Sequence, residues 1–176
     1  MLAMSDPGAG SPSYVHAQYI NAGAGALTAS TQVPNVFIRT GSGNDALQVA
    51  SGQNILDGGL GSNFLTGGTG ADTFFVDARE PGAVWDTLRN FHAGDTATLW
   101  GFNPGVSSFH WDSGIAGAAG SQGATLRADI DGRPGTGAGV SITFAGLNPQ
   151  QAERFQVTTG TAPGGNYLSL HNSGVA

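Results

Sequence analysis

The sequence predicts an all-β protein in which a parallel β-roll is capped by a C-terminal, sandwich-like antiparallel β region, with very little helix. Three observations lead to this fold class. A nine-residue pattern repeats four times without insertion over residues 40–75. Glycine is abundant, at 30 of 176 residues, and apolar residues come in short regular pulses that strands can bury. Cysteine is absent, so neither disulfides nor zinc-thiolate sites hold the fold.

The repeat keeps three columns of residues in phase. Its fourth position is always glycine, its sixth is a short oxygen-bearing side chain, and its eighth is a large apolar residue. These columns hold Gly43, Gly52, Gly61 and Gly70; Asp45, Asn54, Asn63 and Asp72; and Leu47, Leu56, Leu65 and Phe74. We expect a six-residue turn followed by a three-residue strand whose middle side chain faces inward. Glycine is expected because the turn needs positive φ and close approach to its neighbours.

Each nonapeptide is predicted to form half a coil, so turns on one side of the roll belong to alternate repeats, about 4.8 Å apart. This stacks Asp45 with Asn63 on one side and Asn54 with Asp72 on the other. Paired side-chain oxygens among turn carbonyls offer the all-oxygen ligand set that Ca²⁺ prefers. The predicted metal-site residues are therefore those of the sixth and fourth positions: Asp45, Asn63, Asn54, Asp72, Gly43, Gly52, Gly61 and Gly70. The alternative is a metal-free roll whose Asn and Asp side chains cap the turns.

The last repeat, Gly67-Gly-Thr-Gly-Ala-Asp-Thr-Phe-Phe75, resembles the RTX, or haemolysin-type, calcium-binding nonapeptide. The passages Phe74-Phe-Val-Asp-Ala-Arg79, Asp86-Thr-Leu-Arg-Asn-Phe91 and Gly94-Asp95 are similar to the segment downstream of the RTX repeats in serralysin-type proteases and in alginate-epimerase R-modules. The resemblance covers residues 40 to about 102. It implies aspartate ligands at positions 45 and 72, and a non-catalytic module at the C-terminal part of a larger secreted bacterial protein, serving attachment. Such proteins leave the cell through the type I secretion machinery and fold when they meet extracellular calcium.

The chain departs from the family pattern at four positions of the repeat. Aspartate is replaced at Asn54 and Asn63, and the first glycine is replaced at Thr40 and Val49. One carboxylate per site remains, which predicts weak binding, with a dissociation constant of about 10⁻⁴ to 10⁻³ M.

We expect a single domain, residues 1–176, with three parts: N-terminal strands over 14–39, the β-roll over 40–75 and a C-terminal β cap over 76–176. Extending the nine-residue frame puts Val36 upstream and Pro81 downstream at the sixth position, so the roll is expected to hold two complete calcium sites. Two coils bury too little apolar surface to be stable alone, which is why the rest of the chain is expected to cap them.

Alternating and β-branched runs between turn-forming residues mark the expected strands. Besides the repeat, they cover residues 14–20, 33–39, 73–76, 85–91, 96–100, 108–111, 124–130, 140–144, 155–158 and 167–170. One helical turn is expected over residues 148–154, with Asn148 as N-cap, Pro149 at N1 and Gln151 at N3.

Charge and hydropathy limit the partners. The net charge is −6 and the six basic residues are scattered arginines, which argues against nucleic acid and anionic membranes. No run approaches the roughly 18 apolar residues of a membrane span. Residues 1–13 show no conventional signal peptide, which fits type I export by an uncleaved C-terminal signal. The predicted localisation is secreted, extracellular or at the cell surface.

Few residues suggest catalysis, and no catalytic residue is predicted. His92 precedes Asp95 and His110 precedes Asp112, but no nucleophile elbow or His-Glu-x-x-His motif occurs. A capping or ion-paired histidine is the favoured interpretation, which makes a small stand-alone enzyme the least favoured function. Asp129-Ile-Asp131 imitates part of a calcium loop, yet no later Glu completes it, so an ordinary hairpin turn is favoured.

Trp85, Trp100 and Trp111 support a second function. Flat aromatic faces beside Asp and Asn side chains suit sugar stacking, which predicts a carbohydrate-binding or adhesion module for an extracellular polysaccharide. The alternative is that the three tryptophans fill a β core, where their large apolar area is buried.

Overall fold

The computed structural model describes residues 2–3, 17–80, 82–130 and 139–174, which form two β-sheets around one core. The eight-stranded sheet contains, in spatial order, β1 (Leu2–Ala3), β2 (Ala17–Ile20), β4 (Val36–Arg39), β6 (Ile55–Asp57), β8 (Thr73–Asp77), β10 (Thr96–Trp100), β15 (Gly165–His171) and β14 (Gln156–Ala162). The seven-stranded sheet contains β11 (Ser108–Ala116), β12 (Gly123–Asp129), β13 (Gly139–Ala145), β9 (Val84–Arg89), β7 (Phe64–Thr66), β5 (Ala46–Val49) and β3 (Thr28–Thr31).

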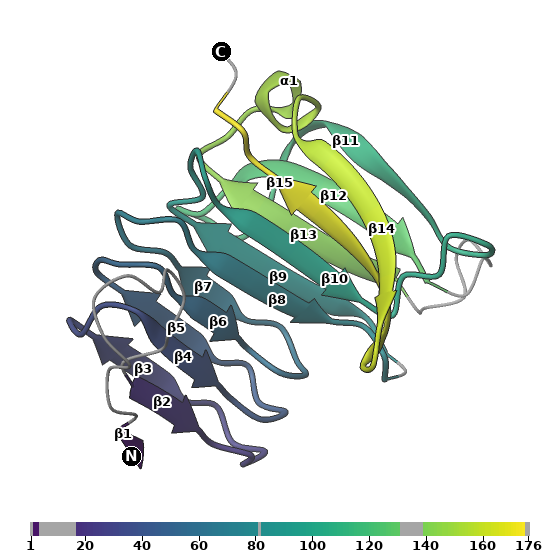
Figure 1. Cartoon of the computed structure of the whole chain (residues 1–176). Helices are drawn as coiled ribbons and strands as arrows, with labels where there is room; N and C mark the ends of the chain where they lie inside the picture. The colour runs from purple at the N-terminus through teal and green to yellow at the C-terminus, as the bar shows by residue number, and fades with distance from the viewer. Residues whose placement is uncertain (1, 4–16, 81, 131–138, 175–176) are drawn as a thin grey trace.

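A parallel β-roll runs from β2 to β10, so the predicted fold class is confirmed. Successive strands alternate between the two sheets, and each pairs in parallel with the strand two places earlier (Figure 1). Within the repeat, paired residues on neighbouring strands are 18 positions apart in the sequence, which places Leu47 opposite Leu65 and Leu56 opposite Phe74. The parallel coil extends beyond residues 40–75 on both sides. Strand β3 is one part that the sequence missed, because Thr28-Ala-Ser-Thr31 lacks a large apolar residue.

The eighth-position residues of the repeat form the centre of the core. Leu47, Leu56, Leu65 and Phe74 are at most 1% exposed. Ile38 precedes them in the same column, and Leu88 and Ala97 continue it after the repeat. Burying a side chain of this size is worth about 1.5–3 kcal/mol, so this column is a main source of the stability of the roll.

The fourth-position glycines let stacked turns touch. A Cβ at Gly70 would lie 2.1 Å from the carbonyl oxygen of Gly52, although Gly70 has no positive φ. Gly61 combines φ of +95° with a similar contact, 2.2 Å from the oxygen of Gly43. Close backbone stacking is therefore the reason these positions share, and positive φ applies only to some of them.

Antiparallel strands cap the C-terminal end of the roll (Figure 1). Strand β13 pairs in parallel with β9, and β12 and β11 then add antiparallel strands. In the other sheet, β15 and β14 follow β10 in antiparallel pairing. The single helix in the described residues, α1 (Pro149–Ala152), begins with Asn148 as N-cap and Pro149 at N1, as predicted, and Asn148 and Gln151 also form a capping box. No described helix is long and apolar enough to cross a membrane.

Candidate metal site

The sixth-position side chains of the repeat form two hydrogen-bonded columns, one on each edge of the roll. At the first edge, where turns lead into the seven-stranded sheet, the backbone N–H of Asp45 donates to Asn63 Oδ1 over 2.9 Å. At the second edge, where turns lead into the eight-stranded sheet, the backbone N–H of Asn54 donates to Asp72 Oδ1, also over 2.9 Å. The structure thus brings together both pairs that the sequence stacks. All four side chains are buried.

Each column contains a further aspartate that the nine-residue frame missed. Asp86 Oδ1 accepts from the N–H of Asn63 over 2.7 Å, and Asp95 Oδ1 accepts from the N–H of Asp72 over 2.8 Å. The spacing is 23 residues here instead of 18, because β8 is two residues longer than β6 and β9 begins three residues before Thr87, the partner of Phe64. The signal in the sequence was the pair Asp86 and Asp95, which lie one repeat apart and each precede a buried core residue by two positions.

Three buried polar atoms at the first edge have no hydrogen-bond partner: Asp45 Oδ2, Asn63 Nδ2 and Asp86 Oδ2. Asp45 and Asp86 each use Oδ1 to accept a backbone N–H, of Leu27 and Asn63 respectively. Leaving a buried polar group unpaired costs about 1–3 kcal/mol, and more for a charged group. Burial raises the pKa of Asp86 to about 8, although contacts with Asn63 oppose this shift. Without a cation, this carboxyl is therefore neutral at pH 7.

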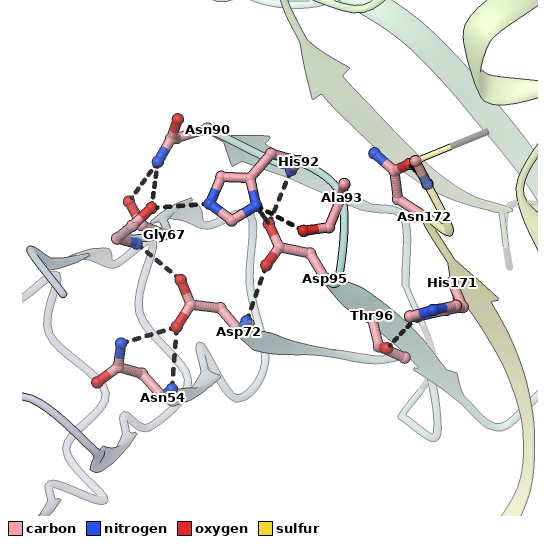
Figure 2. Close-up of polar contacts among 12 residues, drawn as sticks. Asn54, Gly67, Asp72, Asn90, His92, Ala93, Asp95, Thr96, His171 and Asn172 are labelled. Atoms are coloured by element: carbon pink, nitrogen blue, oxygen red, sulfur yellow. Dashed lines mark hydrogen bonds and ion pairs between the residues drawn. The ribbon is translucent and has the colours of Figure 1, made fainter. Parts of the chain in front are cut away.

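Donor groups from the protein itself fill the turns at the second edge (Figure 2). Asn54 Nδ2 lies among three oxygens: Asp72 Oδ1 at 2.7 Å, Ser51 O at 3.1 Å and Gly52 O at 3.2 Å. Asn54 Oδ1 accepts from the N–H of Val36, so both ends of the amide are satisfied. The second oxygen of Asp72 accepts from Gly68 N over 2.7 Å. The Asn54 amide thus occupies the space among these oxygens.

His92 and Asn90 satisfy the next turn at this edge (Figure 2). Asn90 Nδ2 donates to the carbonyl oxygens of Gly67 and Gly68. The two ring nitrogens of His92 face Gly68 O and Ala93 O, each at 3.1 Å, and Nδ1 lies 3.5 Å from Asp95 Oδ2. Carbonyl oxygens only accept hydrogen bonds, so the doubly protonated imidazolium satisfies both contacts.

Electrostatics favour the charged form of His92. Burial lowers its pKa, but the contacts with Ala93 O, the Asp95 carboxylate and Gly68 O outweigh burial and raise the pKa above its usual value. Burial also raises the pKa of Asp95, against hydrogen bonds from the backbone amides of Asp72 and His92. The second edge thus contains a potential positive charge supplied by the chain.

A hard cation fits the first edge better than the second. Asp45 and Asp86 each present a free, buried carboxylate oxygen there, whereas Asn63 Oδ1 is already engaged. At the second edge, Asn54 presents N–H donors to the oxygens that a cation would need, so the predicted Asn54 and Asp72 pair does not fit calcium in this arrangement. Among the described residues, no three His, Cys, Asp or Glu side chains converge on one point, so a cation site there would need backbone oxygens among its ligands.

The three tryptophans do not share one face. Trp100 lies on the eight-stranded sheet beside Tyr167, with ring centroids 5.4 Å apart. Trp85 lies on the seven-stranded sheet, 37% exposed, and its Nε1 donates to Thr143 Oγ1 over 2.8 Å. Trp111 is partly buried and packs against Phe144 of the core, with ring centroids 5.6 Å apart. A platform that combines all three is therefore wrong, since strand alternation sends them in different directions.

The other polar candidates are separated or engaged. Asp112 Oδ2 lies 3.1 Å from Arg127 Nε, and no described contact joins Asp112 to His110. Of the Asp129 and Asp131 pair, Asp131 lies outside the described residues. Searches of family models, curated proteins and solved structures find no match for this chain.

Proposed function

We propose that this chain is a non-catalytic calcium-binding β-roll module whose first edge holds calcium. The observation that carries this proposal is the pair of buried carboxylate oxygens, Asp45 Oδ2 and Asp86 Oδ2, that have no hydrogen-bond partner. A calcium ion accepts oxygen ligands only, and its charge would offset the desolvation of these carboxylates. The two aspartates lie on either side of Asn63, two steps of the column apart, so each anchors its own ion together with turn carbonyls.

Binding would be coupled to folding. The column exists only when the coil is wound, since each sixth-position side chain accepts an N–H from the turn 18 or 23 residues away. The free energy of calcium binding is then also free energy of folding. Asp86 must lose its proton to ligate, so binding at this residue would release a proton and weaken as the pH falls below about 8.

The expected weak affinity fits an extracellular role. With a dissociation constant of about 10⁻⁴ to 10⁻³ M, the site would be empty at cytosolic calcium concentrations and occupied outside the cell. The RTX-like repeat supports the wider proposal that the module belongs to a larger secreted bacterial protein. It would remain loosely folded during type I secretion and tighten on meeting calcium, thereby serving attachment of that protein outside the cell.

Calorimetric titration and thermal melts test this proposal, using Asp45→Asn, Asp86→Asn and, as the matched control from the second edge, Asp72→Asn. In about 10 mM calcium we expect wild-type stability to rise by about 1–3 kcal/mol over chelator, by mass action. Each first-edge variant should lose part of the binding heat. Asp72→Asn should lower stability equally with and without calcium. Absence of binding heat together with an unchanged melt in chelator would reject the calcium site.

A further inference from the structure

The outer face of the eight-stranded sheet carries a strip of charged and aromatic side chains that takes no part in the calcium column. The strip lies where β4, β6 and β8 end at the first edge, and it continues across β10 and β15. Its members, which we call the outer strip, are Arg39, Asp57, Asp77, Arg79, Trp100 and Tyr167. On the strands they alternate with the buried core residues, so their side chains point away from the core.

Strand pairing joins the outer strip in two parts, and between them Asp57 lies opposite Phe75, two residues before Asp77. Arg39 lies opposite Asp57, Trp100 lies opposite Asp77, and Tyr167 lies opposite Trp100. From β4 to β15 there are four interstrand steps in the spatial order of the sheet. At about 4.8 Å a step, the strip is about 19 Å long, enough for several residues of an extended linear chain laid across the strands.

A groove of about 650 Å³ forms one end of the strip. Ile20, Phe37 and Leu60 supply apolar walls, and Arg39 and Asp77 supply charged groups. The turn backbone after β4 and β6 also lines it, at Gly41 and Gly59 among others.

Both arginines of the strip are paired with carboxylates. Arg39 Nε lies 3.3 Å from Asp57 Oδ2, and Arg79 Nε donates to Asp77 Oδ1 over 2.8 Å while Nη2 donates to Oδ2. Burial would raise the pKa of Asp77, but the hydrogen bonds from Arg79 outweigh it and lower the pKa, so this pair stays charged. The arginine side chains remain 49% and 41% exposed, which leaves guanidinium N–H groups for a ligand.

Aromatic rings form the other end of the strip. Trp100 has Tyr167 at 5.4 Å and Phe75 at 6.1 Å between ring centroids, and the Arg79 guanidinium lies over its ring at 5.6 Å. On the neighbouring strand β14, a Cβ at Gly160 would come within 2.5 Å of the Tyr167 hydroxyl. Glycine therefore gives the phenol room to lie across the sheet, with both rings partly exposed.

The chemistry of the strip favours a neutral ligand rich in hydroxyl groups. Nucleic acid needs unpaired cations, but each arginine here has an acidic partner. A protein interface needs a central patch from which charged residues are depleted, whereas four of the six strip residues are charged. An acidic polysaccharide is disfavoured, because the arginines are paired with carboxylates and the protein has a net charge of −6. A hydroxyl both donates and accepts, which matches side-by-side guanidinium and carboxylate groups.

We propose that the outer strip binds a neutral oligosaccharide chain laid across β4 to β15. Arg39, Asp57, Asp77 and Arg79 hydrogen-bond ring hydroxyls. Trp100 and Tyr167 stack against the apolar C–H face of a sugar ring, which buries apolar area on both partners. The side chains of the site point away from the core, and its groove borders the first-edge turns at Gly41 and Gly59.

Affinity electrophoresis tests the proposal in native gels that contain a soluble β-glucan, a mannan, a dextran or, as the acidic arm, alginate. Each gel is run with calcium and with chelator at a temperature below the melting transition. We expect at least one neutral polysaccharide to retard the protein. Trp100→Ala and Arg79→Gln should each raise the apparent dissociation constant about tenfold, a loss of about 1.4 kcal/mol of binding free energy.

Trp85→Ala is the matched control, since Trp85 is an exposed tryptophan under an arginine on the opposite sheet, with Arg127 over its ring at 4.5 Å. It should leave retardation unchanged, and melting curves show whether each variant is folded. A folded Trp100→Ala or Arg79→Gln variant that is retarded like the wild type overturns the site. So does retardation by alginate alone, by none of the polysaccharides, or with equal loss in Trp85→Ala.

Discussion

The two edges of the roll share one backbone design and differ in the atoms that fill it. Each edge stacks three sixth-position side chains, and each side chain accepts a backbone N–H from the preceding turn in its column. At the first edge, the oxygens of Asp45 and Asp86 that face the turns lack partners. At the second edge, the corresponding space receives N–H donors from Asn54, Asn90 and His92.

The repeat therefore determines the backbone of the coil, whereas individual side chains determine whether the oxygens of each turn have a hydrogen-bond donor. Turn carbonyls and carboxylates are acceptors only, so each turn needs a donor or a cation. Where the chain supplies the donor, the edge is complete. Where it does not, the buried carboxyl group stays protonated and neutral, as at Asp86, or its carboxylate must bind a cation from solution.

Converting the second edge into the first should give the largest effect. Asn54→Asp replaces the amide that faces Asp72 Oδ1, Ser51 O and Gly52 O with a carboxylate. In chelator we expect stability to fall by about 3–5 kcal/mol, because an uncompensated charge is buried beside another carboxylate. Millimolar calcium should restore much of this loss, and thermal melts in both conditions measure it.

The same substitution at the first edge is the control for Asn54→Asp. Asn63→Asp adds a buried carboxylate between Asp45 and Asp86, so it should also lower stability in chelator, and it should strengthen calcium binding. If calcium leaves the melting temperature of Asn54→Asp as low as chelator does, the second edge cannot become a cation site. The difference between the two edges would then not depend on the amide nitrogen of Asn54 alone.

Much of the roll was predictable from the sequence because its period is strict. The columns through Gly61, Asn63 and Leu65 set the turn, the stacking and the inward face without any tertiary information. Asp86 was not predictable by the same frame, because the longer strands β8 and β9 shift the phase by five residues. Only hydrogen bonding in the folded chain shows that it continues the column.

The state of each candidate site was harder to predict than its position. Asn and Asp are similar in size and both accept a backbone N–H at the sixth position, so the pattern does not separate a turn with an N–H donor from one without. Asn90 and His92 lie outside the repeat in the sequence, but their side chains contact it in the fold, at Gly68 O. The positions of the tryptophans were also hard to predict, since the sequence alone did not assign Trp85 and Trp100 to different sheets.

An intermediate effect is expected in the pH dependence of the first edge. The pKa of Asp86 is raised to about 8 by burial, above the value of about 4 for an unfolded aspartate. The folded protein therefore binds more protons than the unfolded chain between these values, and its stability falls as the pH rises from about 4 to about 8. In chelator, Asp86→Asn should flatten this slope, as measured by denaturation at several pH values. A wild-type stability that rises over this interval, with the variant unchanged, would contradict a neutral Asp86.

The smallest effect is expected at His92, and it is best measured in the Asp86→Asn background so that the two titrations do not overlap. The pKa of His92 is raised in the folded state, so its contribution is fully present below the unfolded value of about 6.5 and is lost as the pH rises through the folded pKa. His92→Gln keeps at most one of the two contacts, with Gly68 O or with Ala93 O. We expect a loss of no more than about 1 kcal/mol below pH 6, because the side chain is 35% exposed and water screens its charge. The loss should shrink at higher pH and should not depend on calcium. A loss that grows with pH or disappears in calcium would show that His92 does not act as the positive charge of the second edge.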